Sequence, residues 1–306
     1  MRAVQYSTYG SPADALSVVD VDEPHAGPGA VRVRVEAAGV NPVDWKVVAG
    51  AMVGASAGDP VPGGAVTAGK DVAGVVDEVG DGVGDVAVGD RLVGSAASGA
   101  LAEHAVLDLW ARLPETVTAE QAATLPVPAE TALRVLELLD LQDGQTLLVD
   151  GGAGAVGIAI TQIGLARGLR VVSTASEANH DFLVQLGATP TTYGDGLVGR
   201  VRAVAPDGVH GALDAAGKGS VPDLVELTGE PSKVVTIADF GAGELGVHVS
   251  SGDDERERRV REAVQLAGQG VVLVPVARTY ALEDAVAAYE ESRSGHVRGK
   301  LLVVPR

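Results

Sequence analysis

Cysteine is absent from this chain of 306 residues. Its absence excludes disulfide bonds, zinc sites built from thiolates, cysteine nucleophiles and redox-active dithiols. The chain also lacks an uncharged apolar run of about 18 residues, so we expect no transmembrane helix and no membrane partner. The first residues contain no apolar signal core and resemble a strand, so we expect a cytoplasmic protein.

Basic residues are scarce compared with acidic ones. The chain has 23 Lys and Arg against 41 Asp and Glu, a formal net charge of −18. Because nucleic-acid binding requires a basic face that contacts phosphates, we expect no nucleic-acid partner. An anionic cofactor would have to be attracted locally, by helix N-termini and a few cations, against the overall field.

Glycine, in contrast, is abundant, and the most informative glycines lie in residues 147–157. An apolar run breaks there into Gly152-x-Gly154-x-x-Gly157, and a helical pattern follows at once. This order of strand, glycine turn and helix is typical of a dinucleotide site, in which the helix N-terminus faces the pyrophosphate. An incidental glycine turn is the alternative. We predict that a cofactor contacts Gly152, Gly154, Ala155, Val156 and Gly157.

The length predicts about two domains. Alternating apolar residues at 31–36, with further strands at 72–79 and 91–93, indicate an antiparallel β domain in the first 110 residues. Beyond Pro114, helices and strands alternate, which predicts a parallel sheet of βαβ units. We expect helices at 130–140, 155–167, 179–186, 253–267 and 282–294, and strands at 146–150, 170–174, 211–214, 233–238, 271–276 and 301–304.

Several short segments, taken together in their order, resemble one family. They are Asn41-Pro-Val-Asp-Trp-Lys46, Gly69-Lys-Asp71-Val-Ala-Gly74, Val88–Gly94, Ala102–Ala105, Gln121–Pro126, Thr131-Ala132, Leu186–Ala188, Asp214–Gly217 and Gly299–Leu302. With the glycine fingerprint they resemble the zinc-independent medium-chain dehydrogenase/reductases, the quinone oxidoreductase-like enzymes.

The resemblance implies an α/β fold in which a Rossmann dinucleotide-binding domain is inserted in a GroES-like β-barrel catalytic domain. Residues 1–114 plus 268–306 would form the catalytic domain, and residues 115–267 the Rossmann domain. The cofactor would lie in the cleft between them. Family members are commonly dimers, so we expect a homodimer.

Metal ligands are missing where zinc-dependent relatives have them. Those relatives use a cysteine and a Gly-His-Glu segment, whereas this chain has no cysteine and reads Gly69-Lys-Asp71. None of the six histidines forms a short metal-binding spacing. We therefore expect no metal, which disfavours alcohol oxidation, because that reaction needs an alkoxide stabiliser. Reduction of a quinone or an electron-poor alkene needs no such stabiliser.

The cofactor choice depends on the end of the second Rossmann strand. NAD-selective sites carry an acid there, whereas this strand ends in small hydroxyl residues that leave room for a 2′-phosphate. The resemblance places a tyrosine, Tyr193, near that phosphate. Against this, the family often has Lys or Arg at 178 or 179, where this chain has alanine and asparagine, and Glu177 is close. We expect NADPH, with NADH as the alternative, and further contacts from Thr174, Ser176, Tyr193, Ala216 and Ile237.

The expected chemistry is hydride transfer from nicotinamide C4 to a quinone ring or to the β-carbon of an enone. Three side chains are candidates to stabilise the resulting oxyanion: Asn41, Lys46 and Thr131. Each has a structural alternative, as a turn residue, a surface cation and a helix-capping or packing residue respectively. We expect Asp71 to be structural, Asp214 to lie in a turn or at the cofactor edge, and Glu255–Arg259 to form a solvated helix face.

The substrate itself is not identified. The segments 49–66 and 238–252 should shape its pocket, and apart from Phe240 they offer almost no aromatic ring for stacking. A small-molecule quinone or enone fits best. Two other functions stay open: a reductase of a carrier-bound biosynthetic intermediate, and an NADPH-binding sensor or structural protein with little turnover.

Overall fold

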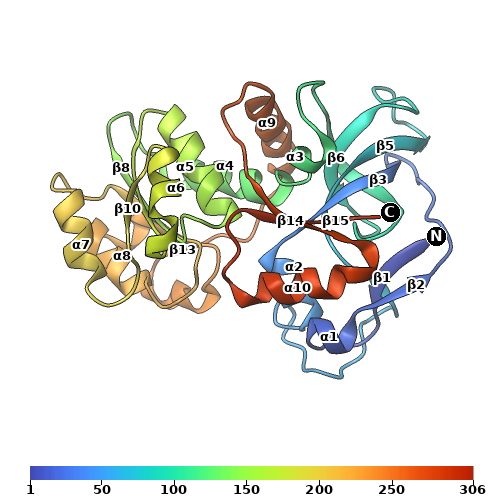
Figure 1. Cartoon of the computed structure of the whole chain (residues 1–306), viewed down its shortest axis with the longest axis horizontal. Coiled ribbons are helices and arrows are strands. Elements are labelled where there is room, and N and C mark those ends of the chain that lie inside the picture. The colour runs from blue at the N-terminus through green and yellow to red at the C-terminus, as the bar shows by residue number, and fades with distance from the viewer. Residues whose placement is uncertain (306) are drawn as a thin grey trace. The chain divides into compact units, whose positions relative to one another are not determined.

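The computed structural model describes residues 1–305 and forms two compact units (Figure 1). The first unit contains Met1–Val127, Val260–Gly268 and the chain from Val274 onward. The second contains Pro128–Arg259 and Gln269–Leu273. In the sequence, residues of the first unit therefore lie both before and after those of the second. None of the helices within residues 1–305 is long and apolar enough to cross a membrane.

The first unit is a β domain. Its larger sheet has six strands in the order β14-β15-β3-β5-β6-β7, and β3 also pairs with β7, so four strands close on themselves as in a barrel. The strands are β3 (Val31–Val40), β5 (Asp71–Val79), β6 (Arg91–Ala96), β7 (His104–Arg112), β14 (Val276–Ala281) and β15 (Lys300–Val304). A smaller sheet has the order β2-β1-β4, formed by Ser17–Asp20, Arg2–Tyr6 and Val66–Thr67.

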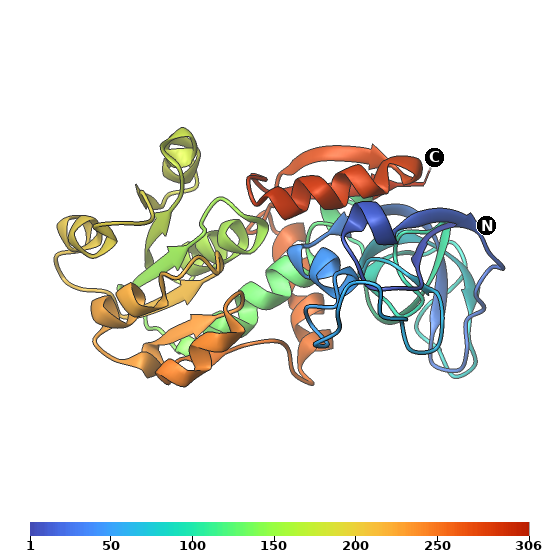
Figure 2. The ribbon, with the colours of Figure 1, turned by 90° about the horizontal axis from the view of Figure 1, so that it is seen from below.

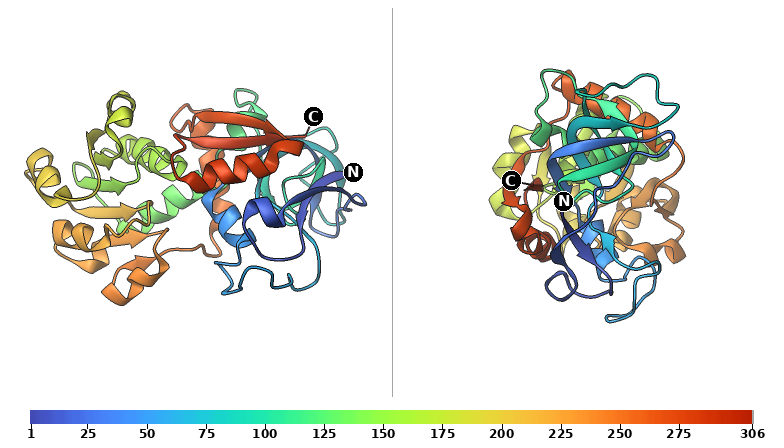
Figure 3. Two further views of the ribbon diagram at one scale, coloured as in Figure 1. Left: turned by 60° about the horizontal axis from the view of Figure 1, so that its bottom comes forward. Right: turned by 90° about the vertical axis from the view of Figure 1, so that its right-hand side faces the viewer.

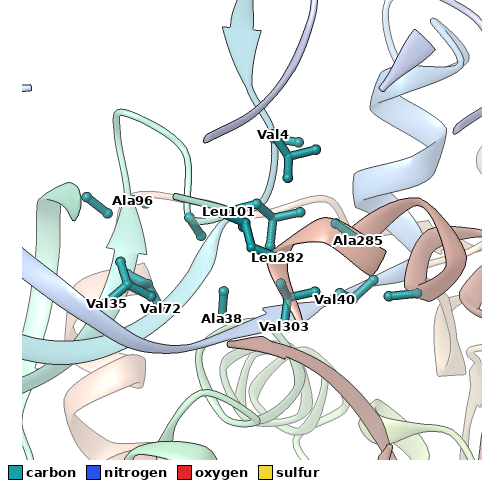
Figure 4. Packing of buried hydrophobic residues seen from close by; sticks show 14 of the residues in the cluster. Val4, Val35, Ala38, Val40, Val72, Ala96, Leu101, Leu282, Ala285 and Val303 are labelled. Atoms are coloured by element: carbon teal, nitrogen blue, oxygen red, sulfur yellow. The ribbon is translucent and has the colours of Figure 1, made fainter. Parts of the chain in front are cut away.

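Alternation along β3 builds the core of this unit. Val31, Val33 and Val35 are buried, as their period of two predicts, while Arg34 is exposed. Figure 4 shows valines of β1, β3 and β5 packed against residues of the C-terminal segment, Leu282, Ala285 and Val303. Full burial of each such side chain contributes about 1.5–3 kcal/mol. The tail therefore supplies part of the core of the N-terminal domain.

Helices in the first unit are few and mostly short. They are α1 (Pro12–Ala15), α2 (Pro42–Val48), α3 (Ala119–Ala122) and α10 (Ala285–Ser294), which the short helix η4 (Leu282–Asp284) precedes. Two longer helices, α4 (Pro126–Leu139) and α9 (Arg256–Gly268), run from one unit into the other along the chain.

The second unit is a doubly wound α/β domain. Its six strands are all parallel, in the order β10-β9-β8-β11-β12-β13, and Figures 2 and 3 show helices on both faces of the sheet. The strands are β8 (Thr146–Asp150), β9 (Arg170–Thr174), β10 (Thr189–Thr191), β11 (Gly211–Asp214), β12 (Val234–Thr236) and β13 (His248–Val249). The helices are α5 (Ala155–Ala166), α6 (His180–Gln185), α7 (Leu197–Val204) and α8 (Val221–Thr228), with short turns η1 (Glu177–Asn179), η2 (Pro231–Lys233) and η3 (Phe240–Leu245).

The strand order reverses between β8 and β11. In sheets of this kind ligands bind outside the carboxyl ends of the strands at such a reversal. Asp150 pairs in register with Asp214, and Asp214 with Thr236, so the carboxyl ends of three strands form one edge. The sequence-based prediction of a parallel sheet in this part of the chain is confirmed.

Two details differ from the sequence-based predictions. The strand predicted at 271–276 is wrong, because β14 starts only at Val276. The apolar Val272 and Val274 that suggested it are buried without belonging to a strand. The compact units also divide the chain at other positions than 114 and 268, since α3 packs against β3 and β5 of the first unit.

Candidate functional site

The turn between β8 and α5 leaves no space for side chains at two of its glycines, Gly152 and Gly157. A Cβ atom on Gly152 would lie 2.6 Å from the Cβ of Ser173, and one on Gly157 would lie 2.3 Å from the carbonyl oxygen of Gly151. A Cβ on Gly154 would meet only one atom within 4 Å, the Gly151 oxygen at 3.5 Å. Glycine is therefore required for packing at Gly152 and Gly157, whereas Gly154 faces space that a ligand can enter.

The N-terminus of α5 carries donors for an anion. Gly154 is the N-cap and provides no side-chain cap. The first backbone N–H groups of a helix have no intrahelical acceptor, and here they belong to Ala155, Val156 and Gly157. Gly154, Ala155 and Val156 are half-buried, and Gly157 is buried. Unpaired N–H groups at a helix N-terminus fit an anion, and the five predicted cofactor contacts, which form this turn, stay a prediction.

The buried carboxyl group of Asp150 stabilises this turn from the interior of the domain. Asp150 accepts hydrogen bonds from the hydroxyl groups of Thr174 and, at 2.6 Å, of Ser220. Thr174 Oγ1 in turn accepts from Gly151 N at 3.1 Å. Burial raises the pKa of Asp150 above its ordinary value. The structure places Thr174, a predicted cofactor contact, inside the protein, where its hydroxyl serves the glycine turn.

The same arrangement recurs on the next strands of the edge. Asp214 accepts from Ala216 N at 3.0 Å, and from Gly217 N and Thr236 Oγ1 at 2.8 Å each. Asp214 is therefore a turn residue. Ala216 lies two residues after the end of β11, Ile237 follows β12 directly, and both are half-buried. They lie at the same edge as the glycine turn, where the prediction places the cofactor.

The two residues predicted near a 2′-phosphate follow neighbouring strands. Strands β9 and β10 are parallel, and Ala175 N donates to Thr191 O at 3.0 Å, which extends their pairing one residue past Thr174. Ser176 and Tyr193 follow these positions and are both exposed, Tyr193 by 58%. Ser176 Oγ accepts from Asn179 Nδ2 at 3.2 Å and makes no cap bond to the following turn.

In the first unit, Asn41 belongs to a buried polar cluster. Its amide nitrogen donates to Asp71 Oδ2 at 2.9 Å, and its amide oxygen accepts from Lys300 Nζ. Lys300 also donates to Asp71 at 2.8 Å, and Asp71 Oδ1 accepts from Val127 N at 3.2 Å. Asp71 thus has the structural role predicted for it. Both polar atoms of the Asn41 amide have hydrogen-bond partners within this cluster. The oxyanion role predicted for Asn41 stays a prediction.

Asp44 closes the first turn of α2 in a capping box with Asn41, whose backbone N–H donates to Asp44 Oδ2 at 2.7 Å. Burial, together with the nearby charge of Asp71, raises the pKa of Asp44 to about 7. Lys46, also on α2, is half-buried, with its ammonium 5.9 Å from the ring centroid of Trp45. No carboxylate within residues 1–305 forms an ion pair with Lys46.

Thr131 lies on α4 in the second unit and is 5% exposed. Arg134 Nη2 donates to Thr131 Oγ1 at 3.3 Å, and the same guanidinium donates to Ser250 Oγ and to Glu130. A hydroxyl oxygen that accepts from a cation keeps its own proton for another acceptor. The geometry thus makes Thr131 a hydrogen-bond donor.

Sequence reasoning missed the charges around Thr131. Arg259 is 4% exposed and pairs with Glu130, Asp253 and Glu137, at 3.4, 2.5 and 2.8 Å. The expectation that Glu255–Arg259 is wholly solvated is therefore wrong. Buried charges of this kind need partners of opposite charge. In the sequence, the burial of Arg259 was indicated only by the apolar residue that follows it, Val260.

Two histidines lie on strands of the two units. His104 Nε2 lies 3.2 Å from Asp77 Oδ2, and His248 is exposed on β13. Across residues 1–305, no group of three or more His, Asp or Glu side chains is arranged to hold a metal ion.

Comparison with known proteins agrees with this architecture. Residues 27–128 match the family model for the alcohol dehydrogenase GroES-like domain, and residues 186–303 match that for zinc-binding dehydrogenase. The mouse quinone oxidoreductase is 30% identical over 330 aligned positions, covering 99% of this chain and 98% of its own. The chain belongs to the quinone oxidoreductase-like family of medium-chain dehydrogenases/reductases.

Other relatives add detail to this assignment. A tomato 2-methylene-furan-3-one reductase is 29% identical, over 100% of this chain and 79% of its own. A mycobacterial protein solved in complex with NADPH has a TM-score of 0.87 and 26% identity, with both chains fully covered. The Escherichia coli quinone oxidoreductase, also complexed with NADPH, shares the fold at a TM-score of 0.86 and 23% identity, again with full coverage.

The buried Asp44 predicts a specific pH dependence of stability. Because its folded pKa of about 7 exceeds its ordinary value of 3.8, its contribution is present below pH 4 and is lost as the pH rises through 7. Asp44→Asn cannot ionise and still accepts from Asn41 N. We expect the free energy of unfolding, measured with urea, to fall between pH 5 and pH 8 by about 2 kcal/mol less in this variant than in the wild type. Asp108→Asn, which removes an exposed carboxyl group of the same unit, is the control. Equal pH slopes in Asp44→Asn and wild type would contradict the prediction.

Proposed function

We propose that this protein is an NADPH-dependent oxidoreductase that transfers a hydride to a quinone or to an activated alkene, without zinc. The observation that carries the proposal is the donor-lined N-terminus of α5 at the strand-order reversal, with Ser176 and Tyr193 in place of a ribose-binding acid. The NADPH complexes of two structural neighbours and the quinone reductases among the relatives support it.

When bound, NADPH supplies the hydride, so the protein's task is to bind, orient and stabilise charge. The N–H groups of Ala155 and Val156 would hold the pyrophosphate. Thr131, whose oxygen accepts from Arg134, would donate a hydrogen bond to the oxygen that becomes negative on reduction, and water would supply the proton that completes the product. Lys46 would add a positive charge that no carboxylate of the described chain neutralises.

A metal-free reaction suits the acceptors proposed. A quinone or an α,β-unsaturated carbonyl is already electron-poor, and its oxyanion can be stabilised by hydrogen-bond donors alone. The absence of cysteine removes the ligand that zinc-dependent relatives use. The tomato reductase among the relatives supports enone reduction as one branch of the proposal. Cytoplasmic location and a homodimer remain predictions.

The first test is NADPH and NADH consumption at 340 nm with matched quinones and conjugated enones. We expect turnover with at least one class and a preference for NADPH, because the chain has small hydroxyl residues at the end of β9, where NAD-selective sites carry an acid. Tight NADPH binding without turnover of any acceptor would contradict the proposal, and would point to a carrier-bound substrate or a protein that only binds the cofactor.

Thr131→Val tests the assigned donor. The variant keeps the shape of the side chain and removes the hydroxyl, so we expect turnover to fall about 10- to 100-fold with an unchanged Kd for NADPH. Thr228→Val is the matched control, because that hydroxyl is buried in the same unit and donates only to backbone carbonyls. Unchanged turnover in Thr131→Val, or an equal loss in Thr228→Val, would remove Thr131 from the mechanism.

A further inference from the structure

A 2′-phosphate needs a nearby cation in a protein with a net charge of −18. The segment that follows β9 does not provide one. It carries Glu177, and alanine and asparagine at positions 178 and 179, all beside the exposed Ser176. If the cofactor carries this phosphate, the attraction has to come from another element.

Arg200 on α7 is the cation that the structure offers. It is half-buried, and its guanidinium donates to four successive backbone carbonyl groups. Nη2 donates to Thr192 O at 3.0 Å, Tyr193 O at 3.2 Å and Gly194 O at 3.1 Å, and Nη1 donates to Asp195 O at 2.6 Å. No acidic side chain of residues 1–305 forms an ion pair with Arg200. Its positive charge is therefore not neutralised by a carboxylate.

The segment bound by Arg200 is the one that carries Tyr193. Residues 192–195 curve around the guanidinium, with Gly194 and Gly196 at positive φ, and a Cβ on Gly196 would lie 3.1 Å from Arg200 Nη1. This segment starts directly after β10, whose last residue, Thr191, accepts from Ala175 N, the residue before Ser176. One side chain thus fixes the backbone of Tyr193 and adds positive charge to the segment that carries its hydroxyl group.

We propose that Arg200 determines the preference for NADPH over NADH. It acts as a positioning residue for Tyr193 and supplies the charge that the 2′-phosphate requires, in place of a cation directly after β9. This inference rests on the proposed cofactor but not on the proposed acceptor. Its test therefore measures binding alone.

The experiment compares Kd values for NADPH and NADH, from fluorescence titration without any acceptor, in the wild type, Arg200→Met, Arg200→Lys and Arg202→Met. Arg202 is the matched control, because it lies on the same helix, is exposed, and pairs with Glu226 at 3.0 Å. Its substitution changes the net charge by the same amount as Arg200→Met.

We expect Arg200→Met to weaken NADPH binding about 10-fold or more, because it removes a positive charge and the anchor of Tyr193, and NADH binding less than about 3-fold. Arg200→Lys should keep most of the NADPH preference, because it keeps the charge, and Arg202→Met should bind both cofactors as the wild type does. Raising the salt concentration should reduce the preference in the wild type more than in Arg200→Met.

An unchanged ratio of the two Kd values in Arg200→Met would overturn the inference. If both Kd values rise equally, Arg200 has a purely structural role, and if neither rises, it has no role in cofactor binding. If Arg200→Met does not fold, Arg200→Lys decides: a folded Arg200→Lys that loses the NADPH preference although it keeps the charge would overturn the inference, and one that keeps the preference would support it. Because no acceptor is present, failure of quinone or enone reduction leaves this result unaffected.

Discussion

The close approach of backbone to backbone at the turn between β8 and α5 is the constraint on which the cofactor edge depends. Gly157 lies so near the Gly151 carbonyl that no side chain fits, and this contact sets where α5 begins. A helix that begins there directs its unpaired N–H groups outward from the carboxyl edge of the sheet. Asp150 and Thr174 bind the turn from inside, so a small polar network anchors the first residue of this glycine-rich loop.

Each unit also contains one cluster of buried charge, and both clusters involve predicted site residues. In the first unit, Lys300 joins the C-terminal strand to Asn41 and Asp71. In the second, Arg134 and Arg259 join α4 to the segment around Ser250 and Asp253. Removal of one partner from such a cluster leaves an uncompensated buried charge and costs about 3–5 kcal/mol. The clusters therefore keep α2 and α4, which carry Lys46 and Thr131, in place.

Because the protein is acidic, an anionic cofactor has to be attracted by a few local hydrogen-bond donors and charges. With a net charge of −18, the protein cannot attract a polyanionic cofactor through its overall field. The groups that we propose for this attraction are the N-terminus of α5, the hydroxyl groups of Ser176 and Tyr193, and the charge of Arg200. Short-range donors of this kind select a ligand by its shape as well as by its charge, because each acts over only a few ångströms.

The sequence by itself determined the parts that depend on neighbouring residues. Alternation along residues 31–36, the apolar run 147–149 and the glycine spacing after it correctly predicted β3, β8, the turn and α5, because these patterns express local backbone geometry. The parallel sheet followed from the alternation of strands and helices. The predicted strand at 271–276 failed because burial of Val272 and Val274 reproduces the period of a strand without its hydrogen bonds.

Only the tertiary structure decided how the side chains are used. Thr174 serves the glycine turn through Asp150, 24 positions away, and Arg134 reaches Ser250 over 116 positions. Lys300 reaches Asn41 over 259 positions. No local pattern encodes such pairs, because the partners meet only after the sheets have formed and brought distant strand ends together. Arg200 illustrates the same point, since a helix residue acquires its role from the carbonyl groups that the fold turns toward it.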